Sequence, residues 1–251
     1  MNADVILLCG ARLNWILHFG LPPRFKKDVK IIQLDNDPLE AHNNIRSEVA
    51  LIGDARVILP QLTKAISEPI MLKSSPWWKK MTELCEKNAK TAGEMMANRD
   101  IPMNYYSPLK IVEESIQKMS GDYIIVSEGS NTMDIGRTIL SNTKARQRLD
   151  AGTFGTMGVG FGFAIAAQAY HPEKKVIMVV GDSAFGFSAM EVETACRYNL
   201  PLKIIIINNN GVSYGSETKS KDDNALNLPV THLNPEARYE MIAQAFGGKG
   251  I

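Results

Sequence analysis

Two short aliphatic runs in this chain end in side chains that can bind a metal ion. The run 176–180 is followed by Asp182, and the run 204–207 is followed by Asn208 and Asn209. A helix-like segment separates the two runs, so together they predict a βαβ unit with parallel strands. Because the C-terminal ends of such strands form the ligand crevice, we expect the carboxylate and amide oxygens at one edge of a sheet.

Magnesium suits a site of this kind. The ion prefers octahedral oxygen ligation, usually takes one or two carboxylates, and completes its shell with phosphate oxygens and water. Asp182, an amide oxygen and a loop carbonyl could hold it beside a diphosphate. Small residues at 181, 183 and 184 would let backbone N–H groups approach the phosphates near a helix N-terminus. From these residues alone, a buried βαβ unit with polar turns explains the pattern equally well.

Segment 181–211 resembles the thiamine-diphosphate motif of the decarboxylase and lyase superfamily, GDG followed by a spacer and NN. Asp182 and Asn209 are 27 positions apart (209 − 182), which suits that motif. Ser183 stands where the motif has its second glycine, as in the branch of 2-hydroxyacyl-CoA lyase and oxalyl-CoA decarboxylase. Residues 13–25 look more like the lyase. The stretches that match this branch are 10–25 (GARLNWILHFGLPPRF), 102–106 (PMNYY), 127–138 (SEGSNTMDIGRT) and 148–167 (RLDAGTFGTMGVGFGFAIAA).

The resemblance implies an α/β fold with a parallel-sheet pyrophosphate-binding domain, preceded by part of a Rossmann-like middle domain. We expect the partial middle domain over residues 1–67, a linker over 68–101, and the pyrophosphate-binding domain, truncated at its C-terminus, over 102–251. The family's activating glutamate belongs to an N-terminal domain that this sequence does not contain, so no catalytic residue is assigned. We expect the chain to be an incomplete portion, with at most weak cofactor affinity and no turnover by itself.

The resemblance also implies thiamine diphosphate and Mg²⁺ as cofactors, and it assigns their contacts. The metal ligands would be Asp182, Asn209 and the carbonyl of Gly211. The carbonyl of Gly155 and the backbone N–H of Met157 would bind the aminopyrimidine ring. The Met157 side chain would wedge the cofactor into its bent form, although a lone methionine in such a loop is otherwise core filling. The other cofactor contacts would be Asn131, Thr156, Gly181, Ser183, Ala184 and again Asn209.

Three further residues, Arg12, Asp35 and Arg137, are candidates for binding CoA or an ADP-like nucleotide. Asp35 ends a predicted strand about 20 residues past a glycine turn, where an acidic side chain can bind ribose hydroxyls. Without the resemblance, Asp35 is explained as a turn residue and Arg137 as a solvated helix residue. The chain departs from the family at Ser213, where a tyrosine is usual.

Three functions follow from these observations. The first is a thiamine-diphosphate- and Mg²⁺-dependent carbon–carbon lyase that cleaves 2-hydroxyacyl-CoA to formyl-CoA and an aldehyde, as in fatty acid alpha-oxidation. The second is an oxalyl-CoA decarboxylase. The third is a non-catalytic nucleotide-binding or assembly module. The first two imply an acyl-CoA substrate and a homo-oligomer, a dimer or tetramer, in the complete protein.

Composition favours an intracellular α/β protein. The net charge of +1 indicates neither nucleic acid nor an anionic membrane as partner. The chain contains no apolar run near the roughly 20 residues that span a bilayer, and we expect no signal peptide. The three cysteines are not spaced for a metal site, which favours reduced thiols. The resemblance implies a peroxisomal or cytoplasmic location, although the final residues Gly-Lys-Gly-Ile are no peroxisomal signal.

Hydrophobic periodicity predicts the remaining elements. Glycine-rich residues 158–162 follow no clear strand, so they are interpreted as close packing at a helix start rather than a dinucleotide fingerprint. Strands are expected at 5–8, 29–34, 50–54 and 123–126, and helices at 55–67, 77–96, 107–119 and 234–246.

Overall fold

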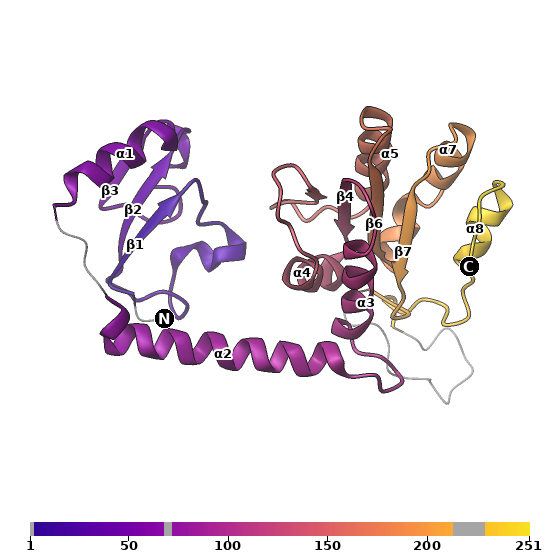
Figure 1. The fold of residues 1–251 in the computed structure, drawn as a ribbon, viewed down its shortest axis with the longest axis horizontal. Coiled ribbons are helices and arrows are strands. Elements are labelled where there is room, and N and C mark those ends of the chain that lie inside the picture. Colours follow the sequence, from indigo (N-terminus) through magenta and orange to yellow (C-terminus); the bar gives the residue numbers. More distant parts are fainter. Residues whose placement is uncertain (1–2, 68–71, 213–228) are drawn as a thin grey trace. The chain divides into compact units, whose positions relative to one another are not determined.

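The computed structural model describes residues 3–67, 72–212 and 229–251, and Figure 1 shows its elements. The chain divides into two compact units, residues 1–82 and 83–251. The division falls inside helix α2 (Pro76–Ala97), which lies within the predicted linker. Both units contain a parallel sheet, as expected for an α/β protein.

The first unit is built on three parallel strands in the order β1-β2-β3. Side chains from one face of this sheet pack into a small core of Leu8, Leu13 and Ile31. Val5 and Leu7, which alternate with the inward residues of β1, are 54% and 43% exposed, so the opposite face is only partly covered. The elements are β1 (Val5–Cys9), η1 (Trp15–Gly20), β2 (Lys30–Asp35), η2 (Pro38–Glu40), β3 (Val49–Ile52), α1 (Ala55–Ala65) and η3 (Leu72–Ser74).

The second unit carries four parallel strands in the order β5-β4-β6-β7. This order means that the chain leaves β4 toward one side of the sheet and leaves β6 toward the other. The elements are α3 (Tyr106–Gln117), β4 (Tyr123–Glu128), α4 (Ser130–Ile139), β5 (Arg148–Asp150), α5 (Gly160–Tyr170), β6 (Lys175–Gly181), α6 (Asp182–Ser188), α7 (Glu191–Arg197), β7 (Lys203–Ile207) and α8 (Glu240–Ala245).

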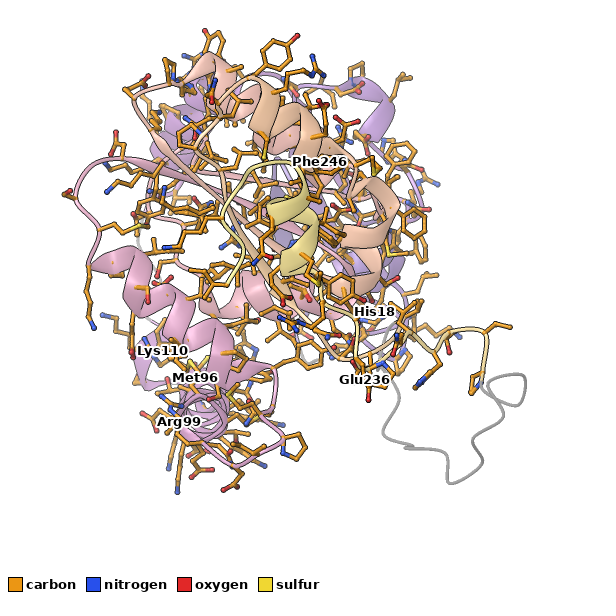
Figure 2. All side chains as sticks on the ribbon, turned by 90° about the vertical axis from the view of Figure 1, so that its right-hand side faces the viewer. His18, Met96, Arg99, Lys110, Glu236 and Phe246 are labelled. Carbon is orange, nitrogen blue, oxygen red and sulfur yellow. The ribbon has the colours of Figure 1, made fainter. Side chains whose placement is uncertain are left out.

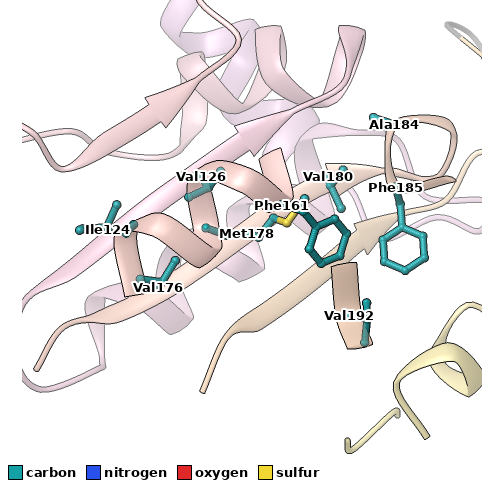
Figure 3. Packing of buried hydrophobic residues seen from close by; sticks show 11 residues of the cluster. Ile124, Val126, Phe161, Val176, Met178, Val180, Ala184, Phe185 and Val192 are labelled. Atoms are coloured by element: carbon teal, nitrogen blue, oxygen red, sulfur yellow. The ribbon is translucent and has the colours of Figure 1, made fainter. Parts of the chain in front are cut away.

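Helices cover both faces of this sheet, as the continuous aliphatic strands predict. One face packs against α5, α6 and α7, with Phe161 and Phe185 at its centre and their ring centroids 5.6 Å apart (Figure 3). The other face packs against α3 and α4 through Leu109 and Ile139. Alternate residues of β6 supply the two cores, Val176, Met178 and Val180 to the first and Ile177 and Val179 to the second.

The C-terminal end of α2 is attached to the second unit. Arg99, labelled in Figure 2 beside Met96, donates from Nη1 to the Met96 carbonyl at 2.7 Å and to the Ser107 hydroxyl at 2.9 Å. Met96 also packs against the core under α3. Among the described residues, no helix is both long enough and apolar enough to cross a membrane.

Most predicted strands and helices are confirmed to within a few residues, but three expectations are wrong. First, a strand, β5, does precede the glycine-rich loop. Its three residues pair with β4, although the sequence shows no aliphatic run there. The segment after Asp182 forms two helices rather than one, with a break at residues 189–190. The predicted helix at 234–246 is helical only over α8.

The strand order places a switch point between β4 and β6. The chain leaves β4 into α4 on one face of the sheet, whereas it leaves β6 into α6 on the other face. The loops therefore diverge at the C-terminal ends of these two strands and leave a crevice between them.

Candidate metal and diphosphate site

A pocket of about 260 Å³ lies at this switch point. Four segments line it: 129–133 after β4, 155–157 before α5, 181–184 after β6, and residues of 209–212 after β7. Tyr105 and Ala151 complete the lining. The structure thus brings together the predicted metal ligands and all the predicted cofactor contacts, which come from separate parts of the sequence.

Asp182 is the charged group of the pocket. Its side chain is 2% exposed, its Oδ1 accepts from the Ser183 N–H at 2.8 Å, and its Oδ2 accepts from the Gly211 N–H at 3.1 Å. Burial raises the pKa of Asp182, and the backbone N–H groups around it oppose that rise only in part. The carboxylate therefore lies in a setting that a cation would stabilise.

The turn after β7 faces Asp182 because of its local hydrogen bonding. Asn208 uses its side-chain oxygen to accept from the Asn210 N–H at 3.0 Å, so this asparagine closes the turn. Asn210 adopts a positive φ of 62°, which asparagine tolerates better than most residues. Asn209 and Gly211 both line the pocket as a result. Ser213, the departure from the family pattern, lies outside the described residues.

The N-terminal end of α4 forms the opposite wall. Gly129 precedes the helix with a φ of +90°, and a Cβ there would lie 3.2 Å from the Gly181 nitrogen, so only glycine lets the ends of β4 and β6 approach so closely. The N–H groups of the first turn of α4 have no intrahelical acceptor and favour an anion. Asn131 lines the pocket and is hydrogen-bonded to the phenol of Tyr105. Burial raises the pKa of Tyr105.

The loop before α5 supplies the third wall. Gly155 has a φ of +63°, so a side chain there would be strained. Met157 lines the pocket and also packs against the core cluster around Phe161. Its role as a wedge for the cofactor stays a prediction.

None of the three CoA candidates is among the described residues that line this pocket. Arg137 forms ion pairs with Asp150 at 3.0 Å and with Asp134 at 3.4 Å, and these partners raise its pKa. In the first unit, Arg12 lies 3.1 Å from a carboxylate oxygen of Glu40. The role of Arg12 and Arg137 in binding CoA stays a prediction.

Asp35 occupies a turn at the end of β2. It is 7% exposed, and its Oδ1 accepts from the Asp37 N–H at 3.0 Å. This is the turn role that the sequence also allowed, and a contact with a nucleotide ribose stays a prediction.

The donor set of the pocket fits a magnesium–diphosphate pair. The described lining residues include no Lys or Arg, so a diphosphate would meet the Asp182 carboxylate with no basic side chain to offset the repulsion. In the described part of the chain, no three His, Cys, Asp or Glu side chains gather into a metal site. An ion held by one carboxylate, one amide and one carbonyl would need phosphate oxygens to complete its shell, as Mg²⁺ prefers.

Two residues of the site were missed by sequence reasoning. Tyr105 was inside a stretch that matched the family but received no role. Glu128, the last residue of β4, is fully buried and accepts hydrogen bonds from the N–H groups of Gly158 and Gly160. An acidic residue at the end of an aliphatic strand, next to a run of small polar residues, was the signal that could have identified it.

Family comparisons divide the chain as the fold does. Residues 1–62 match a family described as "Thiamine pyrophosphate enzyme, central domain", and residues 128–251 match one described as "Thiamine pyrophosphate enzyme, C-terminal TPP binding domain". Thiamine pyrophosphate is the same compound as thiamine diphosphate.

Curated relatives align over almost the whole chain. It is 48% identical to 2-hydroxyacyl-CoA lyase 1 of Homo sapiens over 261 residues, an alignment that covers 99% of this chain and 44% of the relative. It is 37% identical to oxalyl-CoA decarboxylase of Escherichia coli (strain K12) over 250 residues, which covers 99% of this chain and 43% of the relative. The chain thus spans less than half the length of these relatives.

A solved structure shares the fold. An X-ray structure of a protein from Mycobacterium smegmatis, described as a thiamin diphosphate-dependent enzyme, matches with a TM-score of 0.63 and 20% sequence identity. The match covers 97% of this chain and 42% of that protein.

Proposed function

We propose that this chain, which belongs to the thiamine pyrophosphate enzymes, is the cofactor-binding portion of a 2-hydroxyacyl-CoA lyase. The observation that carries the proposal is the pocket at the β4–β6 switch point, where one buried carboxylate and no basic side chain of the described lining would face a diphosphate. The identity of 48% to the lyase of Homo sapiens, against 37% to the oxalyl-CoA decarboxylase of Escherichia coli, favours the lyase.

In this proposal the chain binds Mg²⁺ and the diphosphate between β6, β7 and α4. The Asp182 carboxylate, the Asn209 side-chain oxygen and the Gly211 carbonyl hold the ion. Asn131 and the backbone N–H groups at Gly181, Ser183 and Ala184 contact the diphosphate. These groups would hold and orient the two ligands, and the bound Mg²⁺ would neutralise the diphosphate charge.

The loop before α5 binds the other end of the cofactor. The Gly155 carbonyl and the Met157 backbone N–H contact the aminopyrimidine ring, and the Met157 side chain supports the cofactor from the core side. Thr156 is a further cofactor contact. When bound, thiamine diphosphate supplies the carbon nucleophile for cleavage of a carbon–carbon bond in the 2-hydroxyacyl-CoA. The complete protein is proposed to act as a homo-oligomer, a dimer or tetramer, in the peroxisome or cytoplasm. Arg12, Asp35 and Arg137 remain its candidate contacts to CoA or an ADP-like nucleotide.

Product analysis of the complete protein separates the two enzyme functions. A lyase converts a long-chain 2-hydroxyacyl-CoA to formyl-CoA and a shortened aldehyde, whereas an oxalyl-CoA decarboxylase releases carbon dioxide from oxalyl-CoA. We expect aldehyde from the first substrate and little carbon dioxide from the second. The reverse preference would replace the lyase by the decarboxylase.

Ligand binding separates both enzymes from a non-catalytic module. Thiamine diphosphate is titrated into the chain at millimolar concentration, with and without Mg²⁺, and NMR shifts of the pocket amides are followed. We expect Mg²⁺-dependent shifts that Asp182→Ala abolishes. Shifts that are identical in the wild type and Asp182→Ala would support the module.

A further inference from the structure

Glu128 is a buried carboxylate to which the proposed function gives no role. It ends β4, is 0% exposed, and does not line the pocket. Its Oε1 accepts from the Gly158 N–H and its Oε2 accepts from the Gly160 N–H at 2.8 Å. Both oxygens therefore bind the same short segment, 30 and 32 residues further along the chain.

Beside these two hydrogen bonds there is no room for a side chain at residue 160. A Cβ at Gly160 would clash with the Glu128 carboxylate and lie 2.9 Å from the Met178 Cε. The Gly160 N–H is in the first turn of α5, where it has no intrahelical acceptor and where the helix dipole favours an anion. Burial raises the pKa of Glu128, and the N–H groups of Gly158, Gly160 and Val159 oppose that rise.

The segment that Glu128 holds continues directly into the pocket wall. Residues 155–157 line the pocket and end one residue before Gly158. Gly158 has a φ of +93°, and a Cβ there would lie 3.0 Å from the Phe187 Cβ, so the chain turns tightly at this point. The Glu128 side chain thus fixes the loop to the end of β4, in place of the backbone hydrogen bonds of a β-sheet.

We propose that Glu128 is a positioning residue that fixes loop 155–157 for the aminopyrimidine half of the ligand. The proposal rests on the proposed function, since it takes thiamine diphosphate as the ligand. It separates the two halves of the pocket: Glu128 sets the loop, whereas Asp182 and the end of β7 bind the metal and diphosphate. The diphosphate half does not depend on Glu128, because the β4–β6 ladder, with Glu128 opposite Val180, holds the strand end.

Glu128→Gln tests this role with almost no change in shape. The amide has one acceptor oxygen, so one of the two loop N–H groups must face an NH₂ donor and loses its partner. Glu113→Gln is the matched control. Glu113 is 5% exposed in α3, accepts from the Ser141 N–H at 3.0 Å and from the Ser141 hydroxyl, and does not line the pocket.

The first measurement needs no ligand. Amide hydrogen exchange reports whether the loop is held, and the loss of a hydrogen bond to a charged acceptor should speed local opening about tenfold or more. We expect the Gly158 and Gly160 amides to exchange faster in Glu128→Gln than in the wild type or Glu113→Gln. Equal exchange in all three proteins would overturn the proposal.

The second measurement compares two ligands by NMR titration in the presence of Mg²⁺. Thiamine diphosphate requires both halves of the pocket, and inorganic diphosphate requires only the metal half. We expect Glu128→Gln to weaken thiamine diphosphate about tenfold and to leave inorganic diphosphate nearly unchanged, while Glu113→Gln changes neither. An equal loss for both ligands in Glu128→Gln would overturn the proposal alone. If the wild-type chain binds neither ligand, the proposed function falls and this proposal falls with it.

Discussion

Two buried carboxylates at neighbouring strand ends have different surroundings. Asp182 follows β6 and faces the pocket, whereas Glu128 ends β4 and faces the loop before α5. Both have a pKa raised by burial, and backbone N–H groups are the hydrogen-bond donors that the structure gives to each. Both carboxylates accept hydrogen bonds through both oxygens. Asp182 lines the pocket and Glu128 does not, which is why Asp182 suits a metal ion.

The titration of Glu128 should appear in the pH dependence of stability. Its pKa in the folded chain is raised, so the stability that the protonated form contributes is present below the unfolded value of about 4.3 and is lost as pH rises through the folded value. Glutamine does not titrate. We therefore expect the unfolding free energy of the wild type, relative to Glu128→Gln, to decrease as pH rises. Urea unfolding from about pH 4 upward measures it, and an increase would contradict the direction of the shift.

Gly160 and Gly162 give a matched pair of substitutions in α5. Gly160→Ala places a methyl group against Glu128 and Met178, and overpacking of this kind should cost about 1–3 kcal/mol. Gly162→Ala meets no atom within 4 Å and should stabilise the helix by about 0.5–1 kcal/mol. Urea unfolding of both variants measures the difference. A cost for Gly162→Ala as large as that for Gly160→Ala would show that helix propensity, not the Glu128 contact, decides.

At the scale of elements, the strand order positions the site. In the order β5-β4-β6-β7, α4 follows β4 on one face and α6 follows β6 on the other, so the chain diverges at the ends of these two strands. Each crossover helix is held by core residues on its own face. The shape of the pocket therefore depends on how these helices pack on the sheet, and the core residues that hold them are different from the polar groups of the lining.

Phe161 is the core residue of α5 whose loss should matter most. It is 0% exposed and its ring packs 5.6 Å from that of Phe185, centroid to centroid. Phe161→Ala should destabilise the second unit by about 3–5 kcal/mol. Phe163, two residues further along the same helix, is 38% exposed, and Phe163→Ala should cost less than half as much. Thermal or urea unfolding checks the ratio, and equal losses would contradict the assignment of α5's buried face.

Hydrophobic periodicity in the sequence predicted the aliphatic strands and helices, and residue type predicted the polar side chains at the strand ends. The family pattern in the sequence predicts Asp182, Asn209 and loop 155–157 as site residues, and the structure brings them together in one pocket. The local sequence pattern could not predict β5, because this short strand has no aliphatic run and forms through its pairing with β4. It also could not predict the contact from Glu128 to Gly160, since that depends on how two distant loops fold against each other.

At the scale of the whole molecule, the chain spans less than half the length of its curated relatives. It divides into two compact units, each with its own core and its own parallel sheet. The described residues provide a cofactor pocket, but no Glu of the chain matches the activating residue of the family pattern. Binding and turnover should therefore be separable.

The purified 251-residue chain should bind thiamine diphosphate weakly and show no lyase turnover. The reason is that the proposed pocket would position the cofactor, whereas the family resemblance assigns the activating glutamate to another domain. Aldehyde formation from a 2-hydroxyacyl-CoA is measured for the chain and for the complete protein at equal cofactor concentration. Turnover by the chain alone would contradict this prediction.

The most direct test of the account locates the metal ion. Mn²⁺ replaces Mg²⁺ in an NMR sample of the chain with thiamine diphosphate, and its paramagnetism broadens the amide signals nearest to it. We predict that the Ser183 and Gly211 signals broaden first, and only when thiamine diphosphate is present, and that Asp182→Asn removes the effect. Broadening that is centred elsewhere, or that persists unchanged in Asp182→Asn, would contradict a metal–diphosphate site between the ends of β6 and β7.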